Sequence, residues 1–119
     1  MNNQKLRQSF ALLEAALCEC KTEPENPLRF AALAKAFETT FEYMWKHFKR
    51  EADQAGLEAY SPRDALRFAA QLQLIDDLET WNQFLNARNL SVHDYVGMDD
   101  AAILQLVRQF RDEVKRLIG

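Results

Sequence analysis

The chain has 119 residues, 48% of them hydrophobic and 28% charged, and a formal net charge of −3. This length fits one domain with one core, so we expect a single domain over residues 1–119. The acidic balance argues against a general electrostatic grip on nucleic acid, so we expect no DNA binding and only local contacts with RNA. No apolar run approaches the roughly 20 residues that cross a bilayer, and no apolar segment follows Met1. We therefore expect no membrane association and a cytoplasmic location.

The first half of the sequence predicts two helices. Apolar residues recur at three- and four-residue steps over about 5–21, which is the spacing of one helical face. Asn26 followed by Pro27 suits an N-cap and the first position of a second helix, which ends near Gly56. That helix carries a long apolar stripe, for which core packing is the simplest interpretation. The stripe consists of Phe30, Leu33, Ala34, Phe37, Phe41, Met44, Trp45, Phe48 and Ala52.

The second half predicts three more helical segments. Ser61-Pro62-Arg63-Asp64 is a capping-box-like start and opens a helix over about 62–74. A fourth helix begins at 77 or 78 and runs to about 90, 91–98 is irregular, and Asp99-Asp100 can cap a last helix that reaches the C-terminus. No strand-like alternation or dividing linker interrupts this pattern. We therefore expect an all-α fold, an antiparallel up-and-down four-helix bundle with a short additional helix.

Several familiar site types are absent from the sequence. It holds no Gly-rich phosphate loop, no His-x-x-x-His pair and no cysteine cluster. Cys18 and Cys20 stand two residues apart, so on a helix they point in nearly opposite directions and neither bond together nor chelate one metal. We expect no metal and no cofactor.

One dense polar segment remains at the end of the fourth predicted helix. It places four polar groups within eight residues, namely Arg88, Asn89, His93 and Tyr95. Phosphodiester chemistry uses such groups, because arginine holds phosphate through paired hydrogen bonds and histidine moves the proton of a ribose 2′-hydroxyl near neutral pH. Taken without any family resemblance, Arg88 is better interpreted as the ion-pair partner of a carboxylate on the second helix, and Asn89 as a helix C-cap.

The segment supplies one histidine per chain, whereas metal-free RNA cleavage needs both an acid and a base. A two-fold symmetric dimer would bring Arg88 and His93 of both subunits together. We therefore expect a homodimer, with the site complete only in the dimer.

Three blocks of sequence resemble one known family. They are Phe37-Glu38-x-x-Phe41-Glu42-x-x-Trp45-Lys46, then Ser61-Pro62-Arg63, then Trp81 leading to Arg88-Asn89-Leu90-x-x-His93-x-Tyr95. In order and spacing they resemble the HEPN family (higher eukaryotes and prokaryotes nucleotide-binding domain), in its nucleotidyltransferase substrate-binding-protein branch. The resemblance covers residues from roughly 30 to 118.

The resemblance implies a helical bundle, usually a homodimer, that associates with a minimal nucleotidyltransferase encoded by an adjacent gene. In related toxin–antitoxin pairs the HEPN protein is a ribonuclease toxin, and its partner silences it by adding AMP to the motif tyrosine. By carry-over, we predict a metal-independent ribonuclease toxin with Arg88 and His93 as catalytic residues and Tyr95 as the AMP acceptor. The alternative is a non-catalytic subunit that binds nucleotide or substrate for a two-component nucleotidyltransferase. Tyr95 could instead cover the end of the bundle.

Two carboxylates on the second helix are candidates for a supporting role. Glu38 and Glu42 stand one helical turn apart, and like charges at that spacing repel, so a cation is expected opposite them. Our hypothesis is that one of them orients Arg88. The alternative is a Glu42–Lys46 pair on a solvated face.

Overall fold

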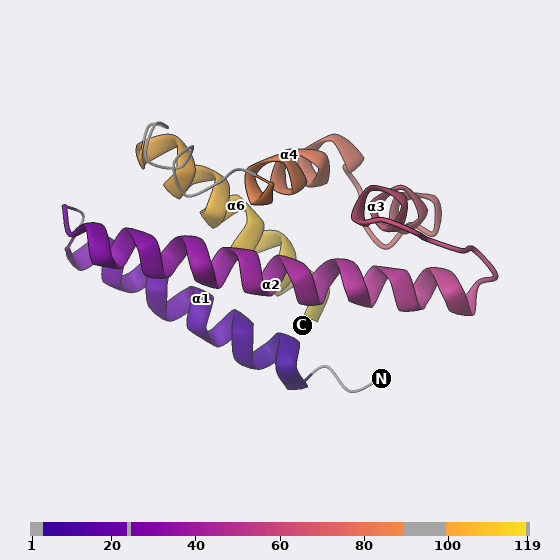
Figure 1. Cartoon of the computed structure of the whole chain (residues 1–119), viewed down its shortest axis with the longest axis horizontal. Helices are drawn as coiled ribbons and strands as arrows, with labels where there is room; N and C mark the ends of the chain where they lie inside the picture. The colour runs from indigo at the N-terminus through magenta and orange to yellow at the C-terminus, as the bar shows by residue number, and fades with distance from the viewer. Residues whose placement is uncertain (1–3, 24, 90–99, 119) are drawn as a thin grey trace. The chain divides into compact units, whose positions relative to one another are not determined.

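A computed structural model describes residues 4–23, 25–89 and 100–118, which form five α-helices and no strand (Figure 1). The helices are α1 (Gln4–Thr22), α2 (Pro27–Gln54), α3 (Pro62–Gln71), α4 (Leu78–Arg88) and α6 (Asp100–Ile118). The expected all-α class is therefore confirmed for the described part of the chain. Within these ranges no helix is both long enough and apolar enough to cross a membrane.

The described residues divide into two compact units. The first contains α1, α2 as far as Thr40, and α6. The second contains α2 from Phe41 onward, together with α3 and α4 as far as Asn89.

Apolar side chains of α1, α2 and α6 form the core of the first unit. The rings of Phe37 and Phe110 meet edge to face with their centroids 5.0 Å apart, an arrangement that aromatic pairs favour. Near the start of α1, Arg7 Nη2 donates a hydrogen bond of 2.8 Å to the carbonyl of Ile118 at the end of α6. The buried members of this core include Leu6, Phe10, Leu13, Leu17, Leu33, Phe37, Ile103, Val107, Phe110 and Val114.

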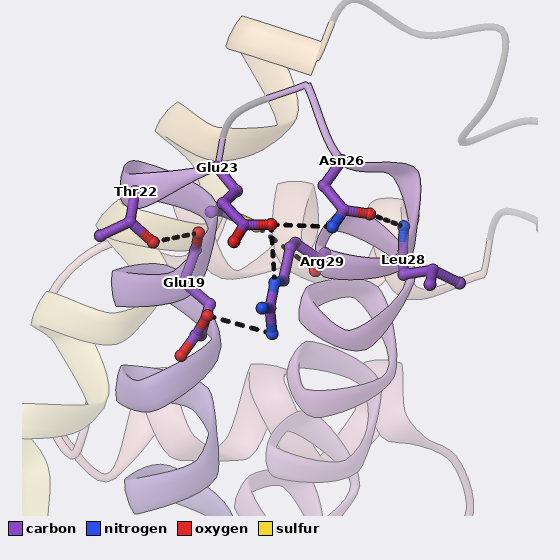
Figure 2. Close-up of polar contacts among 7 residues, drawn as sticks. Glu19, Thr22, Glu23, Asn26, Leu28 and Arg29 are labelled. Carbon is purple, nitrogen blue, oxygen red and sulfur yellow. Dashed lines mark hydrogen bonds and ion pairs between the residues drawn. The ribbon is translucent and has the colours of Figure 1, made fainter.

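A polar network joins the end of α1 to the start of α2 (Figure 2). Asn26 is the predicted cap of α2, because its Oδ1 accepts a hydrogen bond of 3.0 Å from the N–H of Leu28, while its amide donates to Glu23 at 2.9 Å. The guanidinium of Arg29 lies 3.0 Å from Glu19 and 3.4 Å from Glu23. The bond from Asn26 and the contact with Arg29 lower the pKa of Glu23, which keeps that carboxylate ionised at the turn.

Trp81 is the centre of the core of the second unit. Its ring meets Phe48 of α2 at 5.3 Å and Phe84 of α4 at 5.2 Å between centroids, both nearly perpendicular. Asp77 starts α4 as predicted: its side chain accepts hydrogen bonds of 3.2 and 2.8 Å from the N–H and hydroxyl of Thr80, which lower the pKa of Asp77. Because Trp81 anchors α4 against α2, the residues at the end of α4 have a fixed place within this unit.

The third helix ends earlier than the sequence predicted. We expected it to run to about 74, but α3 stops at Gln71. The reason is the conformation of Gln73, whose φ of 60° reverses the chain and lets the N–H of Leu74 bond to the carbonyl of Ala69 at 2.8 Å. This is the closing bond of a Schellman motif. Its start is as predicted, with Ser61 accepting a hydrogen bond from the N–H of Asp64.

The end of α2 has the same Schellman motif, with glycine at the left-handed position. Gly56 has a φ of 81°, and the N–H of Leu57 bonds to the carbonyl of Ala52 at 2.8 Å. Glycine adopts this conformation without a steric penalty, whereas a residue with a Cβ does not. Gln73 therefore carries a backbone strain that Gly56 avoids.

Replacing Gln73 by glycine should raise the free energy of unfolding by about 1 kcal/mol, because the left-handed conformation costs a residue with a Cβ roughly that amount. Urea denaturation of Gln73→Gly measures the gain. The matched control is Gly56→Ala, which should lose a similar amount although a Cβ there would meet no atom within 4 Å. A Gln73→Gly variant no more stable than the parent would contradict this account of the end of α3.

Candidate functional site

Four of the six residues that the sequence analysis singled out are described by the structure. Glu38 and Glu42 lie on α2, Arg88 is the last residue of α4, and Asn89 follows it. His93 and Tyr95 lie outside the described residues, as do the expected irregular segment 91–98 and Asp99 of the proposed cap.

Arg88 forms an ion pair with Glu42. Its Nη2 donates a hydrogen bond to Glu42 Oε1, joining the end of α4 to the second half of α2. Both side chains are only partly exposed, at 26% for Arg88 and 33% for Glu42. Glu42 is thus the carboxylate of α2 that pairs with Arg88.

Asn89 supports the same guanidinium from the other side. Its Oδ1 accepts a hydrogen bond of 2.9 Å from Arg88 Nη1, and its own N–H bonds to the carbonyl of Leu85 at 3.0 Å. Asn89 is therefore both the C-cap of α4, one of the interpretations that the sequence left open, and a partner of Arg88. A cation in this last turn is also favoured by the negative end of the helix dipole.

Trp45, which the sequence pattern placed in the core, also contacts this ion pair. Its indole Nε1–H donates a hydrogen bond of 3.0 Å to Glu42 Oε2, so each oxygen of Glu42 serves one partner. Trp45 is half-buried, whereas its neighbours in the stripe, Phe41 and Phe48, are 0% and 1% exposed. The sequence did contain one indication of this contact. Trp45 follows Glu42 by three residues, and at that spacing on a helix a tryptophan N–H can donate to the carboxylate.

Glu38 lies one helical turn before Glu42 on α2 and is half-buried. Of the two carboxylates, Glu42 has the ion pair with Arg88. A supporting role for Glu38 stays a prediction.

The other histidine of the chain, His47, also lies on α2. His47 is half-buried on α2, its ring lies 5.9 Å from that of Phe48, and desolvation lowers its pKa. Among the described residues, no three His, Cys, Asp or Glu side chains come together as potential metal ligands. The described part of the site is thus a set of hydrogen-bond donors around one carboxylate.

The arrangement can hold an anion. A guanidinium has five N–H donors, and the bonds to Glu42 and Asn89 use one each, so within the described part of the chain Arg88 has further donors for a ligand. Because those two contacts fix its orientation, a phosphate would meet a preorganised partner. The negative charge of Glu42 offsets that of Arg88, however, so a phosphate with no further contacts would be held weakly.

Comparison with known protein families identifies one family for this chain. The sequence profile of the family described as "nucleotidyltransferase substrate binding protein like" matches residues 1–119. The chain belongs to that family. The resemblance that the three sequence blocks indicated is therefore confirmed over the full length. A search of curated proteins finds no match.

For this member of the nucleotidyltransferase substrate binding protein like family, Glu42→Gln should lower the free energy of unfolding by about 1 kcal/mol, because it removes the charge that holds the partly buried Arg88. Urea denaturation at neutral pH measures the loss. Glu38→Gln, one turn away on the same helix, is the matched control and should change stability by less than half as much. Equal losses in the two variants would show that the Arg88 ion pair contributes nothing of its own.

Proposed function

We propose that this chain is the substrate-binding subunit of a two-component nucleotidyltransferase and that Arg88 binds a phosphate group of the nucleotide or acceptor. The observation that carries the proposal is the partly exposed guanidinium of Arg88, which Glu42 and Asn89 orient through two of its five N–H donors. The family description, which names substrate binding and not transfer, supports it. This was the alternative to the ribonuclease in the sequence analysis.

The catalytic half of such an enzyme would come from a partner. Nucleotide transfer needs a phosphate-binding loop and metal-binding acidic residues, and the sequence holds no Gly-rich phosphate loop. A minimal nucleotidyltransferase encoded by an adjacent gene would supply both. In this proposal the present chain contributes ligand contacts and no bond-breaking group.

The finer features of the fold are part of the same proposal. We propose that residues 1–119 form a single antiparallel helical bundle that pairs as a homodimer. Two contacts between α1 and α6 support the antiparallel order: Arg7 reaches Ile118, and Glu14 lies 4.0 Å from Arg111, so rising numbers on α1 meet falling numbers on α6.

Arg88→Ala should weaken binding of AMP on the order of 10-fold or more, because a hydrogen bond to a charged group contributes about 1.5–3 kcal/mol. Isothermal titration of the purified chain, alone and with the partner, measures it. Arg88→Lys should recover only part of the affinity, since lysine keeps the charge and loses the planar fork. Unchanged AMP affinity in Arg88→Ala, with the fold intact by circular dichroism, would exclude this residue from the site.

A ribonuclease toxin is the second candidate. The observation that favours it is the same Arg88, which starts the Arg-x4-His pattern and would stabilise the extra charge of a pentacoordinate phosphate. His93 would act as general base or acid across the dimer, and AMP on Tyr95 would silence the site. This candidate needs groups that the first does not, so the two are separable by experiment.

If the chain is a ribonuclease toxin, expressing it without the adjacent nucleotidyltransferase should arrest growth, and His93→Ala should relieve the arrest at equal protein level. Co-expression of the partner should also relieve it in the parent but not in Tyr95→Phe. Normal growth together with intact RNA in the presence of the pure dimer would leave substrate binding as the function of this chain.

A further inference from the structure

The tryptophan beside Arg88 is placed unlike the other large side chains of its stripe. Phe41, Met44 and Phe48 are buried, and they account for the packing of this half of α2. Trp45 is half-buried, so part of this residue stays accessible to solvent. Tryptophan suits such a position, because its ring is apolar and its N–H needs a polar partner.

The indole is also held in place. Its Nε1–H donates to Glu42 Oε2 at 3.0 Å, and the other oxygen of Glu42 accepts from Arg88. One carboxylate therefore fixes both an aromatic ring and a guanidinium. A side chain with a hydrogen-bonded edge loses less freedom when a ligand meets its face, so the ring is preorganised.

A ring and a cation that bond to one carboxylate match the two parts of a nucleotide. Bases stack on aromatic side chains, and phosphates bind guanidinium groups. Lys46 is exposed on the same face of α2, one turn after Glu42, and adds positive charge where Glu42 removes it. A ligand that carries only a phosphate meets the partly neutralised Arg88, whereas one with a base also contacts the ring.

We propose that Trp45 and Arg88 form a nucleotide subsite, in which the base of a nucleoside monophosphate stacks on Trp45 and its phosphate binds Arg88. Glu42 is the positioning residue, because its carboxylate orients both the indole of Trp45 and the guanidinium of Arg88. This inference rests on the proposed function and adds to it the class of ligand and the residue that recognises the base. Stacking accepts any base, so the subsite selects nucleotides over other phosphates and not one base over another.

The test is isothermal titration of the full chain with AMP, adenosine and inorganic phosphate. Trp45→Ala should lower AMP affinity on the order of 10-fold, within the range for loss of one stacked base, and leave phosphate affinity unchanged. Trp45→Phe keeps a ring without the Nε1–H and should stay within a few-fold of the parent. Tyr60→Ala removes another exposed aromatic side chain, 80% exposed, and should bind AMP as the parent does.

Intrinsic fluorescence gives a second readout. The chain has two tryptophans, and Trp81 is 1% exposed, so quenching by a stacked base reports on Trp45. AMP should quench the parent, phosphate should not, and the quenching should be lost in Trp45→Phe although AMP still binds.

The outcomes separate the two proposals. If Trp45→Ala binds AMP as tightly as the parent while Arg88→Ala does not, stacking on Trp45 is wrong and phosphate binding by Arg88 stands. If Arg88→Ala binds AMP as tightly as the parent, or if the parent binds neither AMP nor phosphate, the proposed function fails and this inference fails with it. Equal loss of AMP and phosphate affinity in Trp45→Ala would also overturn base stacking.

Discussion

The candidate site depends on the hydrogen bonds that the carboxylate of Glu42 accepts. Its two oxygens accept hydrogen bonds from Arg88 at the end of α4 and from Trp45 on α2. One group on α2 therefore orients both side chains. The rest of the second unit keeps this group in register. Trp81 anchors α4 against α2, and Asn89 ends that helix where the guanidinium reaches Glu42.

The sequence predicted most of the described helices, because their apolar spacing and their capping residues can be recognised in it. The ends of α2 and the start of α4 follow from Asn26, Gly56 and Asp77, each of which satisfies free backbone groups. The end of α3 could not be predicted in the same way. Gln73 adopts a conformation that its residue type disfavours, and only the tertiary structure reveals that the chain turns there.

Only part of the candidate site was predictable, because residue type and helical spacing do not identify contacts between helices. Arg88 and Asn89 stood out by residue type, but Glu38 and Glu42 lie one turn apart, so spacing alone cannot tell which of them meets a residue 46 positions after Glu42. The sequence did not single out Trp45, because its ring fits the apolar stripe of α2. The hydrogen bond from its indole N–H to Glu42 leaves no mark in the spacing of apolar residues. His93 and Tyr95 lie outside the described residues, so their roles rest on the sequence.

Substrate binding and RNA cleavage share Arg88 and differ in what surrounds it, and both are compatible with a preorganised nucleotide site. The measurement that tests that site most directly is the NMR signal of the Trp45 indole N–H in a ¹⁵N-labelled chain titrated with AMP. Our account predicts that this signal moves with AMP, that the signal of Trp81 does not, and that in Arg88→Ala the movement needs on the order of 10-fold more AMP. A Trp45 signal that stays fixed while AMP shifts resonances elsewhere would contradict it.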